Sequence, residues 1–70
     1  MSLRELRRQR GLSLEALAVL AGMDIASLSR IERGLQRPRP ETVVRLAKGL
    51  GIAALRMKEI LEHVEEPAGA

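Results

Sequence analysis

Hydrophobic residues recur along most of this chain at the three- and four-residue spacing that places side chains on one face of an α-helix. The clearest example is the stripe formed by Leu14, Leu17, Ala18 and Ala21. Alternating apolar and polar runs of the kind that half-buried strands need are missing from the chain. The pattern therefore predicts an all-α protein.

Start and stop signals divide this pattern into separate helices. Ser2, Ser13 and Asp24 are good N-caps, because their side-chain oxygens accept hydrogen bonds from free backbone N–H groups. Ser2 with Glu5 three residues later also fits a capping box. Glycines, which tolerate the left-handed conformation, follow the apolar stripes. The predicted helices span about residues 2–10, 14–21, 24–33, 40–50 and 54–64, with Pro40 in the first turn of the fourth.

The chain is long enough for one small domain. It has 70 residues, of which 46% are hydrophobic, so it is too apolar to be a disordered segment. No linker divides it, and we expect residues 1–66 to form a single domain. Residues 67–70, which begin at a proline, are expected to be a disordered C-terminal tail.

Composition excludes several classes of function. The chain has no cysteine and one histidine, His63, which cannot form a metal site alone. No apolar run approaches the roughly 20 residues of a membrane span, and no signal-peptide pattern is present. Glu62, Glu65 and Glu66 follow a helix surface, where solvation is the ordinary explanation. We therefore expect a cytoplasmic protein that is not an enzyme, with no cofactor, no metal, no membrane contact and no small-molecule ligand.

Charge is unevenly distributed along the sequence. Residues 1–56 hold eleven Lys and Arg against five Asp and Glu, a net charge of +6, whereas residues 57–70 carry −3. A basic body indicates a polyanionic partner, although arginines that only solvate helices would give the same count. Phe, Tyr and Trp are absent, so the chain lacks the rings on which unpaired bases usually stack. Among nucleic acids, double-stranded DNA is favoured.

The segment 12–34 contains two short helices joined by a tight turn. Gly22 lies in the turn, and Ala18 precedes it by four positions, where a small residue lets two helix backbones approach closely. Such a pair is typical of a DNA-binding helix-turn-helix, with a generic helix hairpin as the alternative. The chain resembles the Cro/cI-repressor-type (XRE) helix-turn-helix family over residues 2 to about 62. The matching stretches are LRELRRQRGLSLEALA, AGM, SLSRIERG and PETVVRLAKGLGI.

This resemblance implies a compact, lambda-repressor-like bundle of five helices that binds double-stranded DNA sequence-specifically as a transcriptional regulator, commonly a homodimer. It also implies roles for individual residues. Arg7 and Glu32 match a structural ion pair between the first helix and the recognition helix, 24–33. The positions expected to face bases are Ile25, Ala26, Ser29 and Arg30. The positions expected to contact phosphates are Ser13, Arg33, Arg37 and Arg39.

Two features depart from this family or leave an alternative open. Leu14 stands where most members have a glutamine, and with Ile25 and Ala26 it makes the predicted reading surface unusually apolar. Specificity would then depend on Arg30, methyl contacts and DNA shape. Alternatively, the chain is a protein-interaction module, an antitoxin or a regulator's partner, whose contact patch is Ile25, Ala26 and Leu28.

The last predicted helix carries an apolar stripe formed by Leu55, Ile60, Leu61 and Val64. We expect its first residues to lie in the core and its later part to be exposed. An exposed end would suit a homodimer seam formed by Ile60, Leu61 and Val64. The alternative is that the whole stripe is ordinary core.

Overall fold

The computed structural model describes residues 1–62 and contains five α-helices over that range, with no strand. In chain order the helices are α1 (Leu3–Gln9), α2 (Leu14–Ala21), α3 (Ile25–Glu32), α4 (Pro40–Leu50) and α5 (Ala54–Glu62). The predicted all-α class is confirmed, and the observed helix ends lie within one or two residues of the predicted ones. Residues His63 and Val64, and the expected domain boundary after residue 66, lie outside the described residues.

The predicted N-caps of the first three helices form as hydrogen bonds. The Glu5 N–H donates to Ser2 Oγ at 3.1 Å, which is the serine half of the expected capping box. The Ala16 N–H donates to Ser13 Oγ at 3.0 Å, and the Ser27 N–H donates to Asp24 Oδ2 at 2.8 Å. Each bond satisfies a donor that the helix itself leaves free, so local sequence fixes where α1, α2 and α3 begin.

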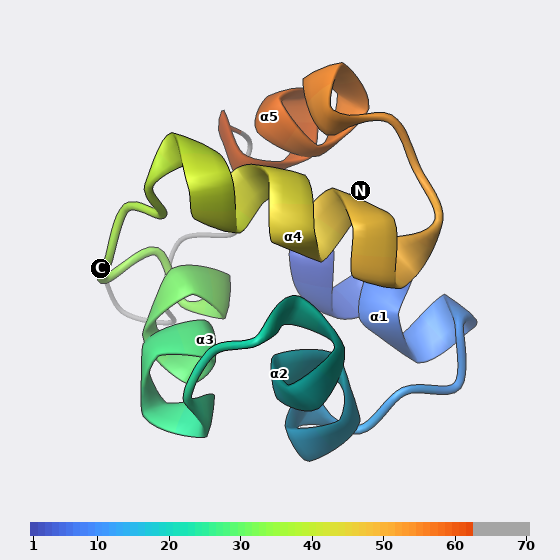
Figure 1. Ribbon diagram of the computed structural model, residues 1–70, viewed down its shortest axis with the longest axis vertical. Helices are drawn as coiled ribbons and strands as arrows, with labels where there is room; N and C mark the ends of the chain where they lie inside the picture. The colour runs from blue at the N-terminus through green and yellow to red at the C-terminus, as the bar shows by residue number, and fades with distance from the viewer. Residues whose placement is uncertain (63–70) are drawn as a thin grey trace.

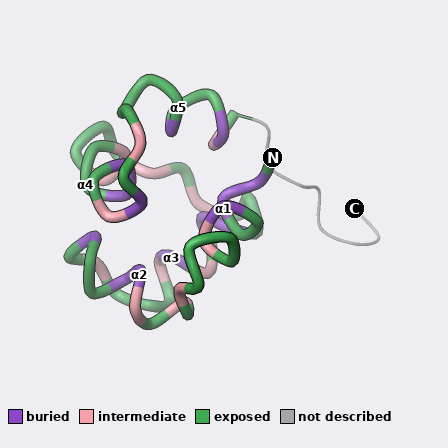
Figure 2. Tube along the Cα trace, turned by 90° about the vertical axis from the view of Figure 1, so that its right-hand side faces the viewer, coloured by how far each residue is buried: buried purple, intermediate pink, exposed green. Residues whose placement is uncertain are grey.

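Helix α4 lies at the centre of the bundle. It packs against α2 on one side and against α5 on the other, and α2 also packs against α3 (Figure 1). Buried positions lie on the inward sides of the helices (Figure 2). The core consists of Leu3, Leu6, Leu17, Ala18, Ala21, Leu28, Ile31, Leu46, Ala47, Leu50, Met57 and Ile60. Each large side chain buried here contributes about 1.5–3 kcal/mol of hydrophobic stabilisation.

Small residues allow the close contacts at α2. Ala18 is buried, and Gly22 ends the helix with φ at +63°, a conformation that glycine adopts without strain. Gly49 on α4 faces α2, and a Cβ added there would lie 3.3 Å from Leu20 Cβ. The expected roles of Ala18 and Gly22 agree with this geometry, whereas the close approach of α4 at Gly49 was not predicted from the sequence.

The prediction for the apolar face of α5 is wrong in its first part. Leu55 is 71% exposed, whereas Met57 is fully buried and Ile60 is 7% exposed. The reason is helical phase, since successive residues turn by about 100° and Leu55 therefore lies about 200° from Met57. The buried face of α5 is set by Met57 and Ile60, and Leu55 projects from the opposite side.

Within the part of the chain that the structure describes, no helix is both long enough and apolar enough to cross a membrane.

Candidate nucleic-acid interface

Helix α3 has one buried face and one exposed face. Leu28 and Ile31 are buried in the core, while Ile25, at 44% exposed, Ala26 and Arg30 face outward. Together with the half-buried Ser29, these outward residues recur at the spacing of one helix face. The structure thus brings all four predicted base-facing residues to one side of α3. Leu28 does not join them, so the apolar contact patch expected for a protein-interaction module is wrong in that residue.

Glu32 and Arg7 form a two-bonded ion pair between α3 and α1. Arg7 Nε donates to Glu32 Oε2 at 2.7 Å, and Arg7 Nη2 donates to Glu32 Oε1 at 3.1 Å. Arg7 Nη1 also donates to the Leu12 carbonyl at 2.9 Å, and Arg4 Nε lies 3.7 Å from Glu32 Oε1. The Glu32 side chain is only 2% exposed. This fork therefore fixes α3 to α1 and to the segment that leads into α2.

Arg30 projects from the exposed face of α3 and is held by two neighbours. Its Nε donates to Gln36 Oε1 at 2.9 Å, and its Nη2 donates to Ser27 Oγ at 3.3 Å. Sequence reasoning missed Gln36. The sequence signal that could have found it is Gly34, because a glycine directly after a helix predicts that the chain reverses there. In the structure the Leu35 N–H donates to the Arg30 carbonyl at 2.8 Å, and this reversal brings the next residue, Gln36, back to the last turn of α3.

The residues predicted to contact phosphates lie exposed around α3. Ser13 caps α2, and because its Oγ is an acceptor for the Ala16 N–H, its hydroxyl hydrogen can be donated elsewhere. Arg33 follows the last turn of α3, where its Nε donates to the Ser29 carbonyl at 3.3 Å. Arg37 and Arg39 lie in the segment between α3 and α4. Leu14 is half-buried and packs against the core, so it adds no exposed apolar surface comparable to Ile25.

Asp24 is the one acidic side chain at the start of α3. The hydrogen bond from the Ser27 N–H, followed by one from the Ser27 side chain, holds the pKa of the Asp24 carboxyl below its ordinary value of 3.8. The charged carboxylate is therefore the better cap, as expected at the positive end of a helix dipole.

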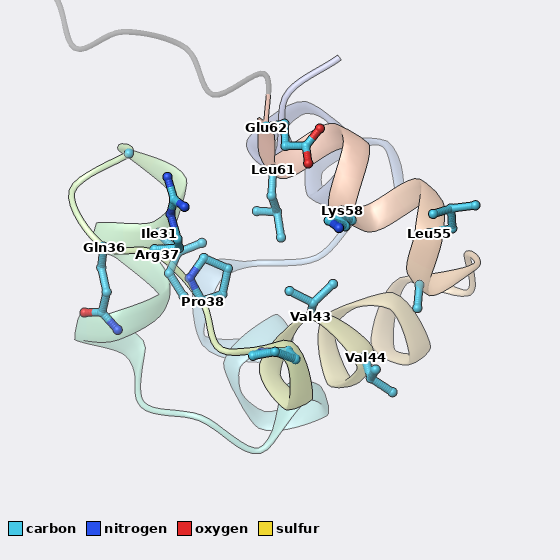
Figure 3. Close-up of a pocket in the computed structure, with 13 residues that line it drawn as sticks. Ile31, Gln36, Arg37, Pro38, Val43, Val44, Leu55, Lys58, Leu61 and Glu62 are labelled. Atoms are coloured by element: carbon cyan, nitrogen blue, oxygen red, sulfur yellow. The ribbon is translucent and has the colours of Figure 1, made fainter.

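An apolar groove with a volume of about 830 Å³ lies between α4, α5 and the segment that joins α3 to α4. Leu61, Val43 and Pro38 line it, with Leu55 and Val44 at its edge (Figure 3). Of the expected dimer seam, Leu61 belongs to this groove, whereas Ile60 is buried in the core of the monomer and offers almost no surface to a second copy. Val64 lies outside the described residues.

Among the described residues, no three His, Asp or Glu side chains come together in a way that could hold a metal ion.

Helices α2 and α3 are short and are joined by a turn that Gly22 caps, and the exposed face of α3 is flanked by arginines. This arrangement is that of a helix-turn-helix domain. The model of a family described as "Helix-turn-helix domain" matches residues 2–59 of the chain. The chain therefore belongs to that family, and the expected resemblance is confirmed.

Several curated relatives carry names of the same kind. The chain is 43% identical over 63 residues to the HTH-type transcriptional regulator DdrOP3 of Deinococcus deserti, covering 90% of this chain and 46% of the relative. It is 43% identical over 65 residues to the HTH-type transcriptional repressor RghR of Bacillus subtilis, covering 91% and 48%. The chain thus spans about half the length of these relatives. No solved structure gives a significant match.

The Arg7–Glu32 pair generates a prediction about stability. Arg7→Met or Glu32→Leu alone leaves a poorly solvated charge, so each is expected to cost about 3–5 kcal/mol of unfolding free energy. The double variant removes both charges and is expected to recover most of that loss. Chemical denaturation of the four proteins measures the coupling. Additive losses in the double variant would contradict the assignment of a coupled, buried pair.

Asp24 generates a prediction about pH. Because its pKa is lowered on folding, its contribution to stability is fully present above the unfolded value of 3.8 and is lost as the pH falls through the lower, folded value. Asp24→Asn keeps a capping oxygen that does not titrate. The difference in unfolding free energy between the two proteins is expected to be constant above about pH 5 and to shift against the wild type below pH 3.8. Denaturant titrations across pH 2–7 test this, and a constant difference throughout would refute it.

Proposed function

We propose that this chain binds double-stranded DNA sequence-specifically and regulates transcription, with α3 in the major groove. The observation that carries the proposal is the exposed face of α3, where Arg30 lies beside uncharged side chains. The Arg7–Glu32 ion pair holds this helix against α1. A major groove about 12 Å wide admits one helix. The relatives named as transcriptional regulators and as a repressor support the same function.

The residues of the interface would divide into two groups. Arg30 can donate two hydrogen bonds to guanine O6 and N7, the commonest specific contact in protein–DNA complexes. Ile25 and Ala26 have no side-chain hydrogen-bond donor or acceptor, so their contacts would be with thymine methyl groups. The phosphate contacts on either side would fix the position of α3 without reading the sequence, and the residues that would make them are Ser13, Arg33, Arg37 and Arg39.

This function needs no bound cofactor and no chemical step on the nucleic acid. Most side chains on the exposed face of α3 and beside it are cationic, hydroxylic, amide or aliphatic, and the one carboxylate there, Asp24, is the N-cap of α3, so the face offers hydrogen-bond donors rather than a nucleophile with its base. We place this function in the cytoplasm of a cell without a nucleus, because the DNA of such a cell lies in the cytoplasm.

A homodimer would allow two copies of α3 to contact successive major grooves about 34–36 Å apart. The apolar groove between α4 and α5 supports such a contact, because Leu55 and Val44 remain exposed at its edge and Leu61 lines it. The proposed seam therefore keeps Leu61 and replaces Ile60 by Leu55.

Substitutions at two arginines test the assignment of base and phosphate contacts. Arg30→Ala is expected to lose about 1–3 kcal/mol of discrimination at one base pair of each half-site, with a smaller loss on random DNA. Arg37→Ala is expected to weaken all sequences alike and to reduce the salt-dependence slope by about one. Fluorescence-anisotropy titrations against a selected operator and a random duplex at several salt concentrations measure both effects.

Equal losses on operator and random DNA for Arg30→Ala would overturn its role in base readout. A wild-type protein that binds neither duplex at micromolar concentration and low salt would overturn the proposed function itself.

The proposed seam is tested by Leu55→Glu. Leu55 is 71% exposed in the monomer, so a charge there is expected to leave the unfolding free energy of the monomer, measured at a concentration below dimerisation, within about 0.5 kcal/mol of the wild type. In a dimer the same charge would be buried, and sedimentation equilibrium is then expected to show a monomer in place of the wild-type dimer. Leu35→Glu, at an exposed position outside α5, is the control. A monomeric wild type, or a variant that still dimerises, would reject this seam.

A further inference from the structure

We infer that Gln36 is a positioning residue that orients the guanidinium of Arg30 for guanine and thereby sets the base preference of the domain. This inference depends on the proposed function, since it assigns a specificity determinant to the same site. Gln36 lies in the segment between α3 and α4, outside the recognition helix, and its role is to act through Arg30 rather than on DNA.

The hydrogen bonds of Arg30 leave one edge of its guanidinium available. A guanidinium carries five N–H donors in a fixed plane. Gln36 Oε1 accepts from Nε at 2.9 Å, and Ser27 Oγ accepts from Nη2 at 3.3 Å. Nη1 donates no hydrogen bond within the described residues, and Nη2 has a second N–H besides the one that it donates to Ser27, so the Nη1–Nη2 end of the guanidinium keeps donors for a further partner. Two parallel donors on that edge match the two acceptors O6 and N7 of guanine.

The backbone places Gln36 firmly enough to orient another side chain. Leu35 N–H donates to the Arg30 carbonyl at 2.8 Å, and Gly34 N–H donates to the Ile31 carbonyl at 3.1 Å, so the chain reverses tightly after α3. Gln36 itself is half-buried. Gln36 is one of the residues that line the apolar groove, and its carboxamide points away from Val43 and Leu61 (Figure 3). The backbone of Gln36 is thus held in place by the turn that ends α3, and its side chain reaches Arg30 across this turn.

The neutral amide suits this position for an electrostatic reason. A carboxylate at Gln36 would also accept from Arg30, but it would add a negative charge next to Arg37 and Arg39, where phosphates are proposed to bind. An amide oxygen fixes the guanidinium and leaves the positive field intact. An arginine already held in one orientation loses less side-chain freedom when it binds guanine.

The test compares Gln36→Met with Gln36→Glu. Methionine has a similar length and lacks a strong acceptor, so it frees the Arg30 guanidinium, whereas glutamate restores an acceptor oxygen. Affinities are measured by anisotropy for a duplex selected from a random pool, for the same duplex with the Arg30-dependent guanine replaced, and for random DNA. Gln36→Met is expected to reduce the guanine preference about two- to tenfold, the range for immobilising one flexible side chain. Its binding to random DNA is expected to stay within about twofold of the wild type.

Gln36→Glu is expected to restore the guanine preference while weakening binding to all three duplexes, which a merely structural role would not produce. In an Arg30→Ala background, Gln36→Met is expected to have no further effect on the preference. In the free protein, the hydrogen exchange of Arg30 Nε–H, followed by ¹⁵N NMR, is expected to be faster in Gln36→Met than in the wild type.

The failures of the two proposals are distinguishable. A wild type without an Arg30-dependent guanine preference overturns the proposed base readout. A wild type that shows this preference, together with a folded Gln36→Met variant that keeps it in full, overturns the positioning role alone. Unchanged exchange of the Arg30 Nε–H in Gln36→Met also overturns that role, independently of DNA.

Discussion

The buried carboxylate of Glu32 is the constraint on which the geometry of α3 depends. Helix α3 has eight residues, too few to be stable alone in water. Leu28 and Ile31 attach it to the core and determine which face of the helix is buried, but apolar contacts are not directional and leave its exact orientation less tightly defined. The fork from Arg7 is directional, because each N–H must point at a carboxylate oxygen. It therefore fixes the orientation of α3 relative to α1, and with it the directions in which the exposed side chains of α3 point.

The same arginine connects three segments of the chain. Besides Glu32, it binds the Leu12 carbonyl, so α1, the entry to α2 and the end of α3 converge on one guanidinium. Buried ion pairs contribute little net stability relative to apolar packing, because both charges lose hydration. What this pair contributes here is a fixed orientation of α3, which the proposed contact with base edges would require more than additional stability.

The local features of the fold could be predicted from the sequence, whereas features set by contacts between distant segments were harder to predict. The caps at Ser13 and Asp24 were correct because a cap depends only on residues within one turn. Leu55 was placed in the core wrongly, since an apolar residue in a helix pattern does not show which phase the neighbouring helix will cover. Gln36 was missed because its contact with Arg30 arises from a chain reversal. The ion pair of Arg7 was expected only through family resemblance, since the two residues lie 25 positions apart.

The small number of polar groups on α3 explains why the domain would use two copies. One arginine forked onto guanine supplies about 1–3 kcal/mol of discrimination, and a symmetric pair doubles this to about 2–6 kcal/mol. Specific DNA-binding proteins discriminate by about 4–10 kcal/mol between their site and other DNA. Methyl contacts from Ile25 and Ala26, together with sequence-dependent DNA shape, would have to supply the difference. When so few hydrogen bonds carry the specificity, each must be made without loss of freedom in the protein. Under the proposed function, the contact of Gln36 with Arg30 and the ion pair of Glu32 would meet that requirement.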